Sequence, residues 1–243
     1  KTYLKHPLSF VLLILIGLAS VITVASIIFI IIYILVNGIP NLTTDLFSLH
    51  YNSKNQSMLP SIFNTVFITF LTLLIAVPIG IFSAVYLVEY AKKGSKLVKV
   101  IRVTTETLAG IPSIVFGLFG FLAFVIALGW GYSMIAGVLT LVMMVLPTII
   151  RTTEEALLAV PNSYREGSFG LGAGKIRTIF KIIVPTAIPG ILSGVILAIG
   201  RIVGETAALI YTSGTVAETA TSLTDSARTL SVHLYCLLSE GLF

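Results

Sequence analysis

Long apolar runs without a charged residue are the feature that most constrains this chain. No Asp, Glu, Lys or Arg occurs in residues 9–36, 61–88 or 107–150. A helix needs about 20 mostly apolar residues to cross a hydrocarbon layer of about 30 Å. Only 10% of the residues are charged, whereas soluble domains carry about 25%. We therefore expect an all-α integral membrane protein.

The lengths of these runs predict the number of spans. The 107–150 run is about twice too long for one helix across a bilayer. Gly129-Trp130-Gly131 can break it, so two spans are expected there. The chain is thus predicted to form a single transmembrane domain, 1–243. Its predicted spans are about 9–36, 61–88, 104–127, 132–150 and 186–212, with a polar loop at 151–185 and a tail at 213–243.

The basic residues predict the orientation. Cytoplasmic loops of membrane proteins carry an excess of Lys and Arg. With a cytoplasmic N-terminus, twelve of the fifteen Lys and Arg residues fall on the cytoplasmic side. These residues are Lys1, Lys5, Lys92, Lys93, Lys96, Lys99, Arg102, Arg151, Arg165, Lys175, Arg177 and Lys181. We therefore expect a multi-pass protein of the cell (inner) membrane with an external tail at 213–243, and the net charge of +5 then indicates topology and no nucleic-acid partner.

The 151–185 loop contains a spaced pattern, E-G-S-x3-G-x9-I-x-V-P. The residues that form it are Glu166, Gly167, Ser168, Gly172, Ile182, Val184 and Pro185. Upstream, Asn162 or Ser163 can cap a helix, with Glu166 three or four residues on. The pattern predicts a short amphipathic helix over 162–174, ending near Gly172–Gly174, which can enter a groove on a partner. The alternative is a simple turn with solvated charges.

This pattern resembles the EAA motif of ABC importer permeases, E-A-A-x3-G-x9-I-x-L-P. Gly167 and Ser168 replace the two alanines, and Val184 replaces leucine. The resemblance implies that the loop couples the chain to a cytoplasmic ATPase. The residues implied in coupling are Ser163, Arg165, Glu166, Gly167, Ser168, Gly172, Ile182 and Pro185.

Other segments are similar to the PstA family of phosphate-specific permeases. They are LVEYAKKGS (87–95), ETLAGIPSIVFGLFG (106–120), LPTIIRTTEEALLAVPNSYREGS (146–168), ILAIGRIVGETAAL (196–209) and TLSVHLY (229–235). This resemblance implies the MetI-like fold of type I importers, with six spans. Five are visible, so we expect a sixth to be missing at the C-terminus. The resemblance also implies phosphate as cargo and, as partners, the permease PstC, a dimer of the ATPase PstB and the phosphate-binding protein PstS. No cofactor is expected in this chain, because ATP and Mg would be bound by the ATPase.

Arg201 and Glu205 lie inside the fifth predicted span. Charged residues at such depth are costly and usually face protein or a water-filled path. On one continuous helix they share a face with the small residues Gly190, Gly194 and Ala198. A guanidinium suits a tetrahedral oxyanion, and Glu205 would hold it when phosphate is absent. The alternative is a static ion pair that fixes helix register.

Arg151 and His233 allow more than one interpretation. Arg151 either lines the inner exit of the pathway, as the resemblance suggests, or anchors its span and pairs with Glu154 or Glu155. His233 has no second ligand at metal-binding spacing, so we expect a structural role and no metal site. Cys236 is the single cysteine, which excludes a disulfide within the chain.

The expected function is therefore a permease subunit of an ATP-driven phosphate importer and not an enzyme. The alternative is a permease for another oxyanion or small solute, such as molybdate, sulfate or an amino acid. An intramembrane enzyme would need a nucleophile paired with a base, and Ser193, Ser213 and His233 show no such pairing. A stand-alone channel would not need the docking loop.

Overall fold

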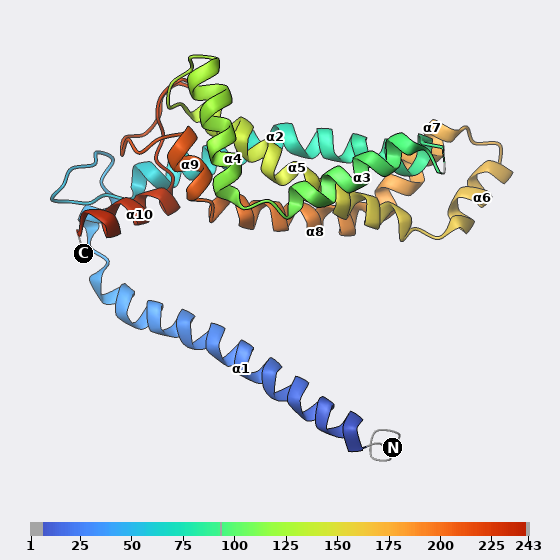
Figure 1. Ribbon diagram of the computed structural model, residues 1–243, viewed down its shortest axis with the longest axis horizontal. Helices are drawn as coiled ribbons and strands as arrows, with labels where there is room; N and C mark the ends of the chain where they lie inside the picture. The colour runs from blue at the N-terminus through green and yellow to red at the C-terminus, as the bar shows by residue number, and fades with distance from the viewer. Residues whose placement is uncertain (1–6, 93, 242–243) are drawn as a thin grey trace. The chain divides into compact units, whose positions relative to one another are not determined.

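The chain is helical throughout the part that the structure describes. The computed structural model describes residues 7–92 and 94–241, and every regular element within them is a helix (Figure 1). The expectation of an all-α protein is confirmed. The chain forms two compact units, residues 1–47 and residues 48–243. Lys1, Lys5 and Lys93, which contribute to the predicted orientation, lie outside the described residues.

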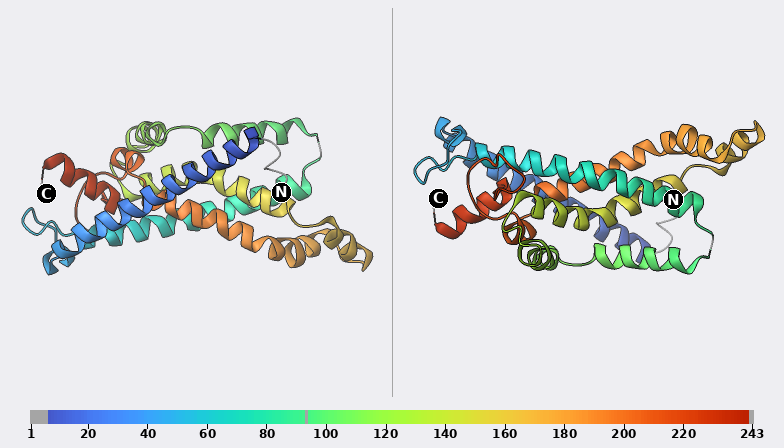
Figure 2. Two further views of the ribbon diagram at one scale, coloured as in Figure 1. Left: turned by 90° about the horizontal axis from the view of Figure 1, so that it is seen from below. Right: turned by 90° about the horizontal axis from the view of Figure 1, so that it is seen from above.

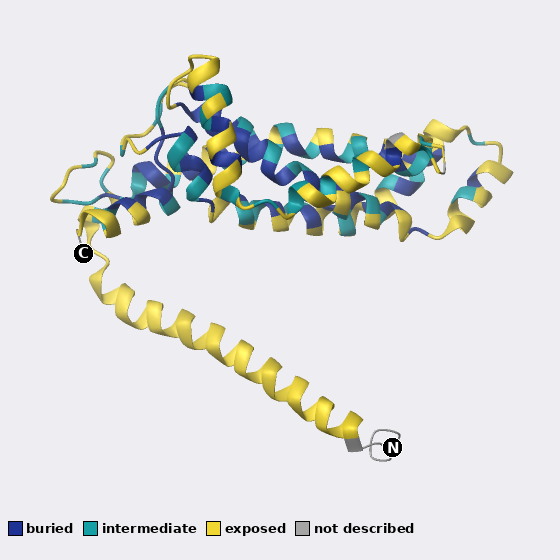
Figure 3. Ribbon diagram, viewed as in Figure 1, coloured by how far each residue is buried: buried dark blue, intermediate teal, exposed yellow. Residues whose placement is uncertain are grey.

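The first unit is dominated by one apolar helix. Helix α1 spans Pro7–Gly38 and is followed by two short 3-10 turns, η2 (Ile39–Asn41) and η3 (Thr44–Phe47). Ser20, Thr23 and Ser26 each donate a hydrogen bond of 2.8 Å to the carbonyl oxygen one turn earlier. All described side chains of α1 are exposed within this unit (Figure 3). A helix that satisfies its own polar groups in this way suits a lipid environment.

Three long helices organise the second unit. Helix α2 (Leu59–Val85) continues into the π-helix η4 (Tyr86–Tyr90), and helix α5 spans Met134–Leu158. Helix α8 (Val184–Val203) follows directly from α7 (Lys175–Thr178) and the π-helix η6 (Ile179–Ile183). Both α2 and α8 pack against α5 (Figures 1 and 2). In the most apolar 18-residue stretch of each helix, 67% of α5 is buried, against 28% for the α2 helix with η4 and 28% for the α8 helix with α7 and η6. Helix α5 is therefore the central helix.

The predicted span at 104–127 is not one straight helix. Helix α3 (Lys96–Ala109) ends before Gly110, and α4 (Ser113–Gly120) continues as the π-helix η5 (Phe121–Ala127). The two parts meet at an angle of 102°. Pro112 explains the break, because it disfavours helical backbone in the residue before it and cannot donate to the preceding turn. The described residues thus hold four helices able to cross a membrane, or five if the bent pair is one span.

The break expected at Gly129-Trp130-Gly131 is confirmed. Gly129 and Gly131 have φ angles of +68° and +65°, which glycine adopts without steric cost. The fifth predicted span, 186–212, is also divided: α8 ends at Val203 and α9 occupies Ala207–Thr212. The tail predicted from residue 213 contains helix α10 (Leu230–Glu240).

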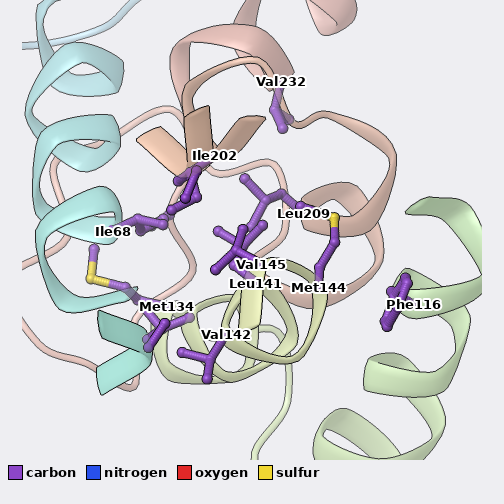
Figure 4. Packing of buried hydrophobic residues seen from close by; sticks show 14 of the residues in the cluster. Ile68, Phe116, Met134, Leu141, Val142, Met144, Val145, Ile202, Leu209 and Val232 are labelled. Carbon is purple, nitrogen blue, oxygen red and sulfur yellow. The ribbon is translucent and has the colours of Figure 1, made fainter. Parts of the chain in front are cut away.

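The core lies where α2, α5, α9 and α10 meet. Side chains of Ile68, Leu141, Met144, Leu209 and Val232 converge there and are at most 1% exposed (Figure 4). A second buried cluster surrounds the other end of α5 and includes Ala84, Leu157, Ile179 and Ile183. Figure 1 shows helix α6 (Asn162–Gly170) beyond this second cluster, at the opposite end of the unit from α10. We call these two ends the α6 end and the α10 end.

Candidate functional site

The predicted docking helix is present as α6. Pro161 occupies the N-cap position, and no side chain caps the helix, so the expected cap by Asn162 or Ser163 is wrong. Pro161 helps to set the start, because it disfavours helical backbone in the residue before it and so separates α6 from the end of α5. The helix ends at Gly170, two residues before the predicted Gly172–Gly174, and Gly172 has a φ of +79°, a left-handed conformation that favours glycine.

One face of α6 is open to solvent. Ser163 and Glu166 are exposed, and a Cβ added at Gly167 would meet no atom within 4 Å. The same exposed surface carries apolar side chains. Tyr164 and Phe169 are each 48% exposed, and Leu171 just beyond the helix is 91% exposed. Exposed aromatic and aliphatic side chains around a carboxylate are typical of a surface that docks on another protein.

Several other motif residues face the protein, whereas Gly172 and Pro185 are exposed. The hydroxyl groups of Ser168 and Thr178 are buried and hydrogen-bonded at 2.8 Å, which joins α6 to α7. Ile182 is half-buried in η6, and Pro185 stands in the first turn of α8. Arg165 also points inward, with a side chain only 16% exposed. The sequence pattern thus combines an outer docking face with inner anchoring residues.

The expected ion pair between Arg201 and Glu205 does not form. Ion pairs within 4.0 Å in the described part of the chain join Arg102 to Glu154, Arg151 to Glu155 and Arg165 to Glu89. Glu205 lies beyond the end of α8, because Gly204 is the C-cap of that helix.

The helix face that would bring the two charges together therefore stops before Glu205. The Glu205 carboxylate instead accepts a hydrogen bond of 3.1 Å from the Ala208 backbone N–H. It thereby caps the first turn of α9, where helical N–H groups have no intrahelical partner. Arg201 remains half-buried near the end of α8.

The small-residue stripe on α8 packs against α5. A Cβ added at Gly194 would overlap the Thr152 hydroxyl oxygen, and one at Gly190 would come within 2.6 Å of the Ala156 Cβ. Of the two environments considered for this face, protein and a water-filled path, Gly190 and Gly194 occupy the first. An open cleft of about 490 Å³ lies between α5 and α8, and Thr152, Glu155 and Ser193 are among the residues that line it.

Arg151 forms one of the two pairs considered for it. Its Nε donates to Glu155 Oε1 at 3.0 Å, four residues on, and both side chains are more than half exposed. Glu154 binds Arg102 of α3 instead, at 2.5 Å. Arg151 therefore lies on the accessible side of α5 with a carboxylate beside it.

Sequence reasoning missed two features of the second unit. Glu89 in η4, the continuation of α2, binds Arg165, 76 positions away, and nothing in the sequence indicates that pairing. Asn64 in α2 is 1% exposed and bonds the backbone of Glu218, Ala220 and Arg228. A polar amide within an apolar run was the available indication for Asn64, since buried amides require partners.

Three comparisons place these features among known proteins. Residues 76–234 match the family model for the binding-protein-dependent transport system inner membrane component. The chain is 35% identical over 241 residues to the probable ABC transporter permease protein YqgI of Bacillus subtilis, covering 93% of this chain and 82% of that protein. It is 45% identical over 140 residues to the phosphate transport system permease protein PstA 1 of Mycobacterium tuberculosis, covering 58% of this chain.

The match to PstA 1 spans 45% of that relative's own length. Among solved structures, the inward-facing MetNI methionine ABC transporter aligns with a TM-score of 0.52 at 20% identity. That alignment covers 74% of this chain and 86% of the MetNI chain. The likeness shows a MetI-like permease fold.

Proposed function

Because the chain belongs to the family of binding-protein-dependent transport system inner membrane components, we propose that it is the permease subunit of an ATP-driven phosphate importer. It would form half of the path across the membrane. The observation that carries this proposal is α6, a helix with an exposed docking face at the spacing of the ATPase-coupling motif. The phosphate cargo is supported by the 45% identity to a permease named for phosphate transport.

In the proposed mechanism the chain does no covalent chemistry. An ATPase would dock on Ser163, Glu166 and Gly167, with Tyr164 and Leu171 providing apolar contact. Hydrolysis in that partner would move α6, and the long helices attached to it would change the access of the path from one side to the other. ATP and Mg would be held by the ATPase, with no cofactor in this chain.

Arg201 is the residue that we assign to the phosphate path. It has no carboxylate within 4.0 Å in the described part of the chain, so its planar fork of donors is available to an oxyanion. Glu205 would shape the same region by fixing the turn between α8 and α9. Arg151, exposed beside Glu155, would lie at the inner exit, where the neighbouring carboxylate favours release of an anion.

The family implies an ATPase and a substrate-binding protein as partners. We propose that the specific partners are the permease PstC, a PstB dimer and the binding protein PstS. The protein is a multi-pass membrane protein, and we propose that its N-terminus is cytoplasmic, as the distribution of basic residues predicts. The α6 end of the second unit would then face the ATPase, and the α10 end would face the binding protein.

The cargo is tested by uptake in liposomes that contain the complete complex. The expected result is ATP-dependent accumulation of phosphate, with sulfate and molybdate excluded, and loss of uptake in Arg201→Gln. Arg102→Gln serves as a control, because it also removes a partly exposed guanidinium but lies on α3, outside the proposed path. Accumulation of sulfate, molybdate or an amino acid in place of phosphate would contradict the cargo assignment and leave the importer assignment standing.

Coupling is tested separately through the exposed face of α6. Glu166→Ala is expected to weaken co-purification with the ATPase, since Glu166 is exposed and its replacement disturbs no buried contact. Unchanged co-purification and uptake in this variant would contradict the assignment of α6 as the docking helix.

A further inference from the structure

Arg165 differs from the other charged residue of the docking motif in where it points. Glu166 is exposed, whereas the Arg165 side chain is 16% exposed and turns toward the long helices. Its Nε and Nη2 donate to the same oxygen, Glu89 Oε1, at 3.0 Å and 2.7 Å. The Glu89 side chain is only 10% exposed. The motif arginine is therefore bound inside this chain and is not presented to a partner.

The same guanidinium also binds the end of α5. Nη2 donates to the Leu157 carbonyl oxygen at 3.1 Å, and Nη1 donates to the Val160 carbonyl oxygen at 3.0 Å. The last carbonyl groups of a helix lack intrahelical donors, and a cation there also suits the helix dipole. Lysine has no planar fork with which to reach several acceptors at once. One side chain thus joins α6 to the ends of both α2 and α5.

A second anchor holds the later part of α6. The buried hydrogen bond between Ser168 and Thr178 joins α6 to α7, which continues through η6 into α8. Arg165 and Ser168 therefore attach the two halves of α6 to different long helices. A displacement of α6 reaches α8 through Ser168 and reaches α2 and α5 through Arg165.

We propose that the Arg165–Glu89 pair is the link that transmits movement of α6 to α2 and α5. This inference rests on the proposed function, because it needs an ATPase that moves α6. Separating the pair would leave two charges shielded from water, which is strongly unfavourable. The pair therefore keeps the end of α2 attached to α6 while the docking face moves. Arg165 is thus a positioning residue that acts through Glu89, and the ATPase is contacted by the exposed face of α6.

The test compares transport with ATP hydrolysis in the reconstituted complex of permeases, ATPase and binding protein. Glu89→Gln and Arg165→Lys are measured for ATPase co-purification, ATP hydrolysis and phosphate uptake. We expect both to assemble and hydrolyse ATP while phosphate transported per ATP falls by about tenfold, a typical loss when two coupled sites are disconnected.

Arg102→Gln is the matched control. Arg102 and Glu154 form another ion pair between helices, with Arg102 49% exposed, and their loss should leave the ratio of transport to hydrolysis unchanged. An unchanged ratio in Glu89→Gln would overturn the proposal. So would failure of both single variants to bind the ATPase, which would make the pair part of the docking surface. Failure of the unmodified complex to transport phosphate or bind an ATPase would instead contradict the proposed function.

Discussion

The two ends of the second unit each contain an arginine that is largely shielded from solvent, and the two are stabilised in different ways. At the α6 end, Arg165 binds a carboxylate and two backbone carbonyl groups. At the α10 end, Arg228 is 3% exposed, and its guanidinium lies over the Tyr51 ring at 4.8 Å. Its Nε and Nη2 are buried without a hydrogen-bond partner in the structure, and no carboxylate in the described residues pairs with it.

The difference shows which interactions hold each connection between long helices. The α6 end is held by a charge pair, which suits a segment that must transmit force without separating. The α10 end is held by neutral hydrogen bonds from Asn64 to the α9–α10 connection, while the charge of Arg228 is offset only by an aromatic face. A cation–π contact is weaker than a buried ion pair with additional hydrogen bonds. The same substitution should therefore have different consequences at the two arginines.

The largest effect is expected for Arg165→Met. It would leave Glu89 shielded from water without a counter-charge, and should lower the free energy of unfolding by about 3 kcal/mol. The thermal unfolding temperature in detergent should then fall by about 6–12 °C. Arg102→Met is the control, because its side chain is 49% exposed and an exposed pair contributes less than about 1 kcal/mol. Equal shifts in the two variants would show that burial does not distinguish the pairs.

The long helices were predictable from the sequence, but their interruptions were less so. Uncharged runs predicted α1, α2 and α5, because a bilayer sets a minimum length for an apolar helix. The spacing from Glu166 to Pro185 predicted α6. The break at Gly204 was not predicted, since glycine also occurs inside intact helices: Gly80 lies within α2 and Gly137 within α5.

The partners of the charged residues were the least predictable part of the site. Helical periodicity placed Arg201 beside Glu205 only on the assumption of one continuous helix, and the C-cap at Gly204 removes that assumption. Arg165 and Glu89 are 76 positions apart, so their contact depends on how α2 packs against α5. Local patterns contain no information on such long-range packing, whereas the stripe of Gly190 and Gly194 predicted helix contact correctly because it depends on one helix alone.

Asn64→Ala is expected to have the second largest effect, at the α10 end. Asn64 donates to the carbonyl oxygens of Glu218 and Arg228 and accepts from the Ala220 N–H. Its removal should cost about 2 kcal/mol, because buried backbone groups lose their partners. Thermal unfolding and protease cleavage of the 213–229 connection would measure it. Thr107→Val on an exposed part of α3 is the control, and resistance of the Asn64 variant to cleavage would show that the connection is held by other contacts.

Arg228→Met should leave the free energy of unfolding within about 1 kcal/mol of its original value, or raise it slightly. An apolar side chain of similar length removes a buried cation without leaving an unpaired carboxylate, and such replacements are often neutral or stabilising. Thermal unfolding measured beside Arg165→Met gives the direct comparison of the two ends. A fall in unfolding temperature as large as that of Arg165→Met would mean that Arg228 makes a stabilising interaction of similar strength. The contrast between the two ends would then disappear.

The smallest effect is a pH dependence confined to the α10 end. Burial lowers the pKa of His233, and the nearby Arg228 charge lowers it further, while the Gln56 backbone and the Glu240 charge oppose the shift. The Tyr51 ring also packs against the imidazole, edge to face at 5.8 Å. The folded state therefore binds a proton at His233 less readily than the unfolded state does. The stability contributed by neutral His233 is fully present above the usual pKa of 6.5. It is lost progressively as the pH falls below that value.

Thermal unfolding temperature should therefore fall between about pH 6.5 and pH 5, the range in which an unfolded histidine gains its proton. His233→Gln should remove much of that fall, and Arg228→Met should reduce it, because it removes the second cause of the lowered pKa. His50→Gln, at an exposed histidine, should leave the fall unchanged. If Arg228→Met does not alter the pH profile, then the cation at the α10 end is compensated after all, and the two ends of the unit differ less than their hydrogen bonds indicate.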